Sequence, residues 1–505
     1  MAHQRRLACP AKLIKFIKRL KLTTKNKKNN KYITTKTTKT MFKKETYIGR
    51  RAELARRVGK GLILLPGNPE VPNNYPNNTY YFRQDSTFRY YFGLDVPSLI
   101  GLIDAETGEA MLFGDDFTVE DIIWTGPMPT IADQAAEVGV EKSYPLAEVR
   151  GILRKAIEQN RPVHYLPPYR AELKIGVADM LGIRLDMLHE RKSLDLMFAV
   201  AEMREKKSAE EIEALERAFK IGYQMHMTAM RMCRPGVVER EIAGKVEGIA
   251  KSYGQGVSFP TIVTQHGEIL HNHNHDGVLE AGRLLLVDGG GESVEGYCSD
   301  HTRTYPVSGK FTDRQKDIYN IVLRAHSQVK DMIKPGLLYP EIHKAAYMSL
   351  AEGLKGVGLI KSTPEEAVEA GALYMFMPHG LGHGMGMDVH DCENIGERSF
   401  DFSTVLERAT KSATCVHRAT WRVEPGTVMS DEPGIYFIPA LIDKMRSEGK
   451  FKGIVDYDKL DTYRDFGGIR IEDDVLVTET GSRFIGDKLL PLSVEELEAV
   501  VGKDC

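Results

Sequence analysis

LLLVDGGG, residues 284–291, is an apolar run that ends abruptly in Asp288 and continues in glycines. This pattern predicts a buried strand with a charge at its end, where burial of a lone ionised group would be strongly unfavourable. YCSDHTRTYPV, residues 297–307, places Asp300 beside a second strand-like run. We therefore expect a cationic group to meet these two acids.

Three further segments of the C-terminal half are built around polar residues in the same way: MPHGLGHGMGMDVHD (377–391), MSDEPGIY (429–436) and GIRIEDDVLV (468–477). They add His383, Glu432 and Glu472 to the two aspartates. Four carboxylates that converge would raise one another's pKa, whereas two divalent cations would cancel their charge. Oxygen ligands with a single imidazole favour a hard ion such as Mn²⁺. Because carboxylates can bridge two metals that hold a hydroxide nucleophile, the set indicates two-metal hydrolysis.

The strand pattern also predicts how these residues are arranged. The runs around Asp288 and Asp300 read as neighbouring strands joined by a Gly-rich turn, so the two aspartates are expected opposite each other. The last segment alternates with period two, which predicts a charged face and an apolar face. These faces would be Arg470, Glu472 and Asp474 against Ile469 and Ile471.

Composition indicates a soluble protein of two domains. The chain has 505 residues, 42% hydrophobic and 27% charged, which is more than one ordinary core would hold. The net charge of -2 gives no reason to expect nucleic acid or an anionic membrane as partner, and no apolar run approaches the length of a membrane span. The six cysteines show no CxxC pairing, which favours a reducing compartment, and cytoplasm is the simplest location.

The chain divides into three parts. Residues 1–40 are rich in Lys, Asn and Thr, lack acids, and are expected to be a disordered basic extension or a translation-start artefact. Residues 41–200 alternate helical stretches with short apolar runs, which predicts an α/β domain. Ser208 followed by Glu211 is a capping-box signature that opens a helix, so a second domain is expected over residues 201–495.

Taken together, these segments resemble the pita-bread metallopeptidases, and within them the Xaa-Pro aminopeptidases (aminopeptidase P). The motifs EILHNHN, LLLVDGGG, SDHTRTYPV, HGLGHGMGMDVHD, EPGTVMSDEPGIY and GIRIEDDVLVTETG stand in that family's order, and RQDSTFRYYFGL (83–94) resembles its N-terminal domain. The resemblance covers residues 46 to 490 and implies an α+β protein. Its catalytic domain would be a curved, mainly antiparallel sheet with helices, preceded by a smaller α/β domain.

The resemblance also implies the ligand set. One metal would be held by Asp300, His383, Glu432 and Glu472, and the second by Asp288, Asp300 and Glu472. The ions would be Mn²⁺, with Co²⁺, Fe²⁺ or Zn²⁺ as alternatives. A hydroxide that bridges them would attack the peptide carbonyl.

Further roles follow from the same resemblance. Glu432 would take the water's proton and pass it on, while His271 and His390 would orient the substrate and stabilise the oxyanion. His379 would lie near the proline pocket. Arg470 would pair with a metal-binding carboxylate and set its orientation.

Other polar residues in these segments are expected to have no chemical role. His273 and His275 share the tract HNHNH with His271 but do not match the family's position. Asp473 and Asp474, which follow Glu472, are expected to be structural or solvated. His301 stands where the family usually has an aliphatic residue.

The implied activity is release of the N-terminal residue from peptides that have proline in second position. Prolidase, which cleaves Xaa-Pro dipeptides, shares the ligands and the domain layout and remains the alternative. A non-catalytic binding protein of the same fold is a remote third. The implied partners are Xaa-Pro peptides and further copies of the chain, as a dimer or tetramer, with neither nucleic acid nor membrane.

Overall fold

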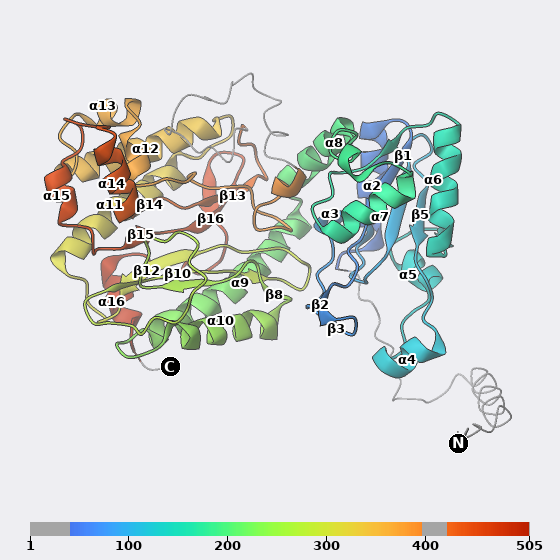
Figure 1. The fold of residues 1–505 in the computed structure, drawn as a ribbon, viewed down its shortest axis with the longest axis horizontal. Helices are drawn as coiled ribbons and strands as arrows, with labels where there is room; N and C mark the ends of the chain where they lie inside the picture. The colour runs from blue at the N-terminus through green and yellow to red at the C-terminus, as the bar shows by residue number, and fades with distance from the viewer. Residues whose placement is uncertain (1–40, 396–421, 504–505) are drawn as a thin grey trace, which may run out of the picture.

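The computed structural model describes residues 41–395 and 422–503. The predicted basic extension, residues 1–40, lies outside the described residues. Figure 1 shows two lobes, an N-terminal lobe coloured blue to green and a larger lobe coloured green to red. None of the helices in the described ranges is both long and apolar enough to cross a membrane.

The N-terminal lobe is a mixed five-stranded sheet with helices, in the strand order β6-β5-β4-β1-β7. β1 pairs antiparallel with β4 and parallel with β7, and the apolar runs read from the sequence supply these strands. Its strands are β1 (Leu62–Pro66), β4 (Ile100–Asp104), β5 (Ala110–Phe113), β6 (Lys142–Tyr144) and β7 (Val163–His164), with the hairpin β2 (Pro72–Tyr75) and β3 (Asn78–Thr79). Its helices are α2 (Lys44–Val58), α3 (Ser86–Phe92), α4 (Val119–Thr125), α5 (Ile131–Glu137), α6 (Val149–Glu158), α7 (Ala171–Leu181) and α8 (Leu194–Glu205).

The larger lobe opens with α9 (Ala209–Met232), and the predicted capping box is confirmed. The Ser208 side chain accepts from the Glu211 backbone N–H, and the Glu211 side chain accepts from that of Ser208. Its other helices are α10 (Glu239–Tyr253), α11 (Asp313–Met332), α12 (Tyr339–Gly356), α13 (Pro364–Glu369), α14 (Pro439–Ser447), α15 (Tyr457–Asp461) and α16 (Val494–Val500). The strands are short, and the pairs among them are antiparallel. The lobe is therefore α+β, as expected.

The strands that the structure describes in this lobe, outside residues 396–421, form four small sheets. β9 (Ile262–Thr264), β10 (Leu284–Asp288) and β12 (Thr302–Pro306) make one, and β8 (Gly256–Val257) and β11 (Gly291–Glu292) another. β13 (Val428–Asp431), β16 (Asp473–Val477) and β17 (Ser482–Phe484) make the third, and β14 (Gly434–Tyr436) and β15 (Gly468–Arg470) the fourth.

The prediction that Asp288 and Asp300 lie opposite each other was wrong. In the antiparallel pair of β10 and β12, Asp288 stands opposite Thr302, and Asp300 precedes the strand. The two arms keep one antiparallel register from this pair to the bridge between Glu292 and Cys298, and they approach closely, since a Cβ on Gly290 would lie 1.6 Å from the Ser299 carbonyl oxygen. Glycine at position 290 thus permits this close approach, and the residue opposite Asp288 is Thr302, two positions after the predicted Asp300.

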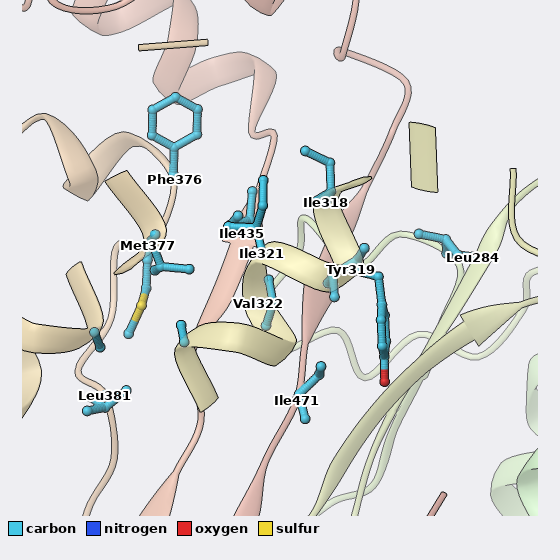
Figure 2. Packing of buried hydrophobic residues seen from close by; sticks show 14 of the residues in the cluster. Leu284, Ile318, Tyr319, Ile321, Val322, Phe376, Met377, Leu381, Ile435 and Ile471 are labelled. Carbon is cyan, nitrogen blue, oxygen red and sulfur yellow. The ribbon is translucent and has the colours of Figure 1, made fainter. Parts of the chain in front are cut away.

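The last segment is split into β15 and β16 because it changes partner from β14 to β13. Glu472 lies at the change and forms a bridge with Thr302. Ile469 and Ile471 belong to the main hydrophobic cluster, and Figure 2 shows Ile471 near Val322 and Tyr319 of α11. The predicted apolar face is confirmed.

A buried ion pair lies behind this segment. Arg303 donates two hydrogen bonds of 2.9 Å to Asp473, whose Oδ2 also lies 3.1 Å from His326 Nε2. Both partners are buried, so Asp473 is structural, and the alternative that it is solvated was wrong. Although burial raises the pKa of Asp473, Arg303 and His326 together hold it below its usual value.

Removing one partner of this pair should destabilise the lobe strongly. We expect Arg303→Ala to lower the free energy of unfolding by about 3–5 kcal/mol, because Asp473 would be left buried without its counter-charge. Urea unfolding followed by circular dichroism measures this change. Arg464→Ala is the control, since Arg464 pairs with Asp443 at the surface and such pairs contribute little. An equal shift of the two midpoints would contradict the prediction.

Candidate metal centre

All nine residues predicted for the site line one cavity of about 550 Å³. They come from segments far apart in the chain, and the cavity is also lined by Arg83 of the N-terminal lobe. The nine are Asp288, Asp300, His383, Glu432, Glu472, His271, His379, His390 and Arg470. The structure thus brings the whole predicted set together.

The tightest cluster is formed by Asp300, His383 and Glu472. One candidate ligand atom from each lies within 4.8 Å of the others, and all three residues are buried. His383 Nε2 is 3.5 Å from Asp300 Oδ2 and 3.8 Å from Glu432 Oε1. This spacing would let one cation contact an imidazole and several carboxylates together.

Hydrogen bonds fix the orientation of His383. Its backbone N–H donates to Ser430 Oγ, and its carbonyl accepts from the Ser430 N–H. Its Nδ1 lies 3.2 Å from the Gly384 carbonyl oxygen, which can only accept. The proton therefore belongs on Nδ1, and the Nε2 lone pair is directed toward the carboxylates.

Arg470 and Thr302 order the other side of the cluster. The Arg470 guanidinium pairs with Asp288 and donates to Tyr436 Oη at 2.9 Å and Thr302 Oγ1 at 3.1 Å. Thr302 in turn donates to Glu472 Oε2 at 2.7 Å. Two of the carboxylates are thus held by groups that tie β12 to β15.

The buried carboxylates of the cluster would be stabilised in their ionised form by a nearby positive charge. Burial first, and then the charges of neighbouring carboxylates, raise the pKa of Asp300 and of Glu472 well above their usual values. Within the described residues, Asp288 Oδ1 and Asp300 Oδ1 are buried and accept no hydrogen bond. Oxygen atoms in this state fit divalent cations as ligands.

The predicted substrate histidines lie around the cluster. His379 Nδ1 is 2.7 Å from the Gly380 carbonyl oxygen, so it carries the proton, and Nε2 accepts from Tyr436 Oη at 2.8 Å. The His390 ring centroid lies 3.9 Å from that of His383, and its Nδ1 is 2.7 Å from Glu393 Oε2. These contacts hold both imidazoles beside the carboxylates.

Other residues of the same motifs have separate positions. His273 lines the cavity with His271, whereas His275 Nε2 lies 3.1 Å from the Thr261 carbonyl oxygen. Burial lowers the pKa of His301 to about 3, and this ring packs edge-on against Phe219. His301 is therefore a neutral core residue.

Asp474 is buried and holds the backbone of Asp300, one residue of the cluster, in place. Its Oδ2 accepts from the Asp300 backbone N–H at 3.2 Å, so it is structural and not solvated. The hydrogen bond ties the backbone of Asp300 to β16. This contact could not be read from the sequence, because it joins residues 174 positions apart.

Sequence reasoning missed three residues of the site: Arg83, Thr302 and Tyr436. Each stands in a quoted motif, RQDST, SDHTRT or EPGIY, yet none was given a role. Thr302 follows Asp300 by two residues, and Tyr436 follows Glu432 by four residues. Only the structure shows that Thr302 meets Glu472, that Tyr436 meets Arg470 and that Arg83 reaches the cavity.

Comparisons with known proteins agree with this geometry. A model of metallopeptidase family M24 matches residues 213–479, and a model of the aminopeptidase P N-terminal domain matches residues 47–165. The chain is 30% identical over 466 residues to the Xaa-Pro aminopeptidase of Escherichia coli (strain K12), covering 90% of this chain and 96% of that protein.

A human protein and a solved structure are similar as well. The Xaa-Pro dipeptidase of Homo sapiens is 30% identical over 452 residues, covering 87% of this chain and 88% of its own. Aminopeptidase P from E. coli with the inhibitor Pro-Leu has a TM-score of 0.73 at 27% identity, covering 91% of this chain and 98% of that chain.

The raised pKa of Glu472 leads to a prediction for the metal-free protein. A carboxyl group whose pKa is raised by folding favours the folded state below its unfolded pKa, and this contribution is lost as the pH rises through the folded pKa. We therefore expect Glu472→Gln to raise the Tm of EDTA-treated protein at pH 8, with the difference closing toward about pH 4.

The same variant should lose the stabilisation that metal provides, because a ligand would be gone. Differential scanning fluorimetry with and without Mn²⁺ measures both effects. His273→Gln is the control within the cavity and should keep the wild-type response. An equal Mn²⁺-induced rise of Tm in Glu472→Gln and wild type would contradict the assignment.

Proposed function

The chain belongs to metallopeptidase family M24, and from this premise we propose that it is an Xaa-Pro aminopeptidase. It would release the N-terminal residue from peptides that have proline in second position. The observation that carries the proposal is the cavity lined by four carboxylates and the His383 imidazole, in which Asp300, His383 and Glu472 form a cluster close enough to share a cation.

Two divalent ions would occupy this cavity. Asp300, His383, Glu432 and Glu472 would hold one ion, and Asp288, Asp300 and Glu472 would hold the other. Hard oxygen donors support Mn²⁺ as the native metal, with Co²⁺, Fe²⁺ or Zn²⁺ as alternatives. When bound, the ions would supply Lewis acidity and would lower the pKa of a water, so that hydroxide is available near neutral pH to attack a carbonyl.

Protein groups would manage the protons and the substrate. Glu432 Oε2 lies 3.7 Å from His379 Nδ1 at the edge of the cluster, where it would accept the water's proton and deliver it to the leaving nitrogen. His271 and His390 would orient the scissile carbonyl and donate to the developing oxyanion. Arg470 would keep Asp288 in its ligand orientation.

Apolar residues of the cavity support a pocket for the proline ring. The bond before proline has no N–H, so recognition relies on a pocket for the ring. Phe259, Pro260, Leu270 and Val389 give the cavity apolar walls beside the polar cluster. His379, held by Tyr436, would lie against the proline.

The two arginines of the cavity support an aminopeptidase over a dipeptidase. A dipeptide would bring its carboxylate into the cavity and need a free cation there. Arg470 is paired with Asp288, and Arg83 is paired with Glu292 and Asp388. Within the described residues, each lining guanidinium group therefore already has a carboxylate partner. Prolidase remains the second candidate because the human Xaa-Pro dipeptidase is equally similar in sequence.

Location and assembly complete the proposal. The described cysteines Cys233, Cys298 and Cys392 are buried and free, which supports a reducing compartment such as the cytoplasm. A homodimer or homotetramer is the proposed assembly, and light scattering of the full chain tests it.

A matched pair of peptides tests the activity. We expect metal-stripped protein to regain cleavage of an Xaa-Pro-Xaa tripeptide on addition of Mn²⁺, with far slower cleavage of the Xaa-Pro dipeptide. Chromatography of the released residue measures both rates. Cleavage confined to the dipeptide would make the protein a prolidase, and failure to cleave either by Mn²⁺-loaded protein would refute the proposal.

The two histidines that line the cavity from one tract should differ in effect. We expect His271→Ala to reduce kcat on the tripeptide by about 100-fold through loss of an oxyanion donor. His273→Ala should stay within about twofold of wild type, because it only lines the wall. Steady-state kinetics measures both, and similar losses in the two variants would contradict the separate roles.

A further inference from the structure

The segment 387–391 carries His390, yet its side chains are held mainly by the N-terminal lobe. It follows His383 closely in sequence, and its two acids, Asp388 and Asp391, both contact Arg204. Asp388 also accepts from Ser86 Oγ of α3 at 2.7 Å. The wall of the cavity that bears His390 is therefore fastened to the other lobe.

Arg83 makes the most extensive of these contacts. Its NH1 donates to Asp388 Oδ1 at 3.2 Å, and its NH2 donates to the Met387 carbonyl oxygen at 2.7 Å. Its Nε donates to Glu292 Oε2 at 2.8 Å. One guanidinium thus joins the segment 387–391 to β11, which lies between Asp288 and Asp300 in sequence.

Arg204 of α8 fixes the same segment from the buried side. Its NH2 lies 3.0 Å from Asp388 Oδ2 and 2.5 Å from Asp391 Oδ1, and its side chain is 1% exposed. Arg83 is 33% exposed and lines the cavity. Arg204 therefore serves as a buried anchor, whereas Arg83 reaches the cavity itself.

The backbone next to His390 is not in a relaxed conformation. Cys392 has φ 62°, a left-handed value that a side chain with a Cβ adopts only when its surroundings impose it. His390 itself is held through Nδ1 by Glu393. The position of the imidazole over His383 therefore depends on what holds the segment on both sides.

We propose that Arg83 is a positioning residue for the reaction, which acts on the cavity through segment 387–391 and His390. This inference rests on the proposed peptidase function. Arg83 would make activity depend on contact between the lobes, because the guanidinium comes from one lobe and the imidazole from the other. A small displacement of a substrate-orienting group can reduce turnover on the order of 100-fold.

Steady-state kinetics on the tripeptide with Mn²⁺ tests this role. Arg83→Gln should lower kcat by about 10- to 100-fold and leave KM within about threefold. Arg83→Lys should recover part of the loss, since an ammonium can still pair with Asp388. Combining Arg83→Gln with His390→Ala should be no worse than His390→Ala alone, because both changes remove one function.

Hydrogen exchange gives a readout that does not need activity. In Arg83→Gln, peptides spanning residues 384–395 should exchange faster, while those of α12 stay as in wild type. Arg161→Gln is the matched control, since Arg161 is 30% exposed and pairs with Asp104 inside the N-terminal lobe. This control should change neither kcat nor exchange in 384–395. Asp388→Asn tests the same contact from the larger lobe if Arg83→Gln does not fold.

Several outcomes would overturn the inference. These are wild-type kcat in Arg83→Gln, losses that multiply with His390→Ala, an effect on KM alone, or unchanged exchange in 384–395. If wild-type protein cleaves neither peptide, the proposed function fails, and the exchange experiment alone decides whether Arg83 holds the segment.

Discussion

Mutual repulsion among carboxylates that share one buried cavity is the constraint on which the rest of the structure depends. Asp288, Asp300, Glu432 and Glu472 line the same space, where Arg470 pairs closely with Asp288 and, at 4.0 Å, with Glu472. Burial strengthens this repulsion, because the groups are removed from water. Burial and this repulsion raise the pKa of Asp300 and of Glu472, and the surrounding hydrogen bonds hold these side chains in place.

Those hydrogen bonds are made largely by neighbouring residues of the strands that carry the acids. Asp474 accepts from the Asp300 N–H, and Thr302 donates to Glu472. Behind them the buried pair of Arg303 and Asp473 connects β12 to β16, with a further bond from Arg303 to the Glu472 carbonyl oxygen. The acids are thus placed by a rigid inner layer, which suits a site that must hold like charges together.

Periodicity explains what the sequence could predict. An acid that ends an apolar run, such as Asp288, marks the end of a buried strand. The period-two alternation predicted that Ile469 and Ile471 lie in the core. The register of Asp300 could not be predicted, because it depends on where the hairpin turns, which is between Ser293 and Tyr297. For Asp473 the sequence left a structural and a solvated role open, since no local pattern shows that Arg303 will neutralise it.

The contacts of Arg83 show why one lobe could not be understood without the other. Its partners Glu292 and Asp388 lie 209 and 305 residues away, so no local pattern could reveal them. Each is an acid that would be unpaired near the cavity if the lobes separated, and one belongs to the segment that carries His390. Separation would therefore expose two carboxylates and loosen a cavity wall in the same event. Arg83 therefore links contact between the lobes to the position of the cavity wall that carries His390, because one guanidinium makes both ion pairs.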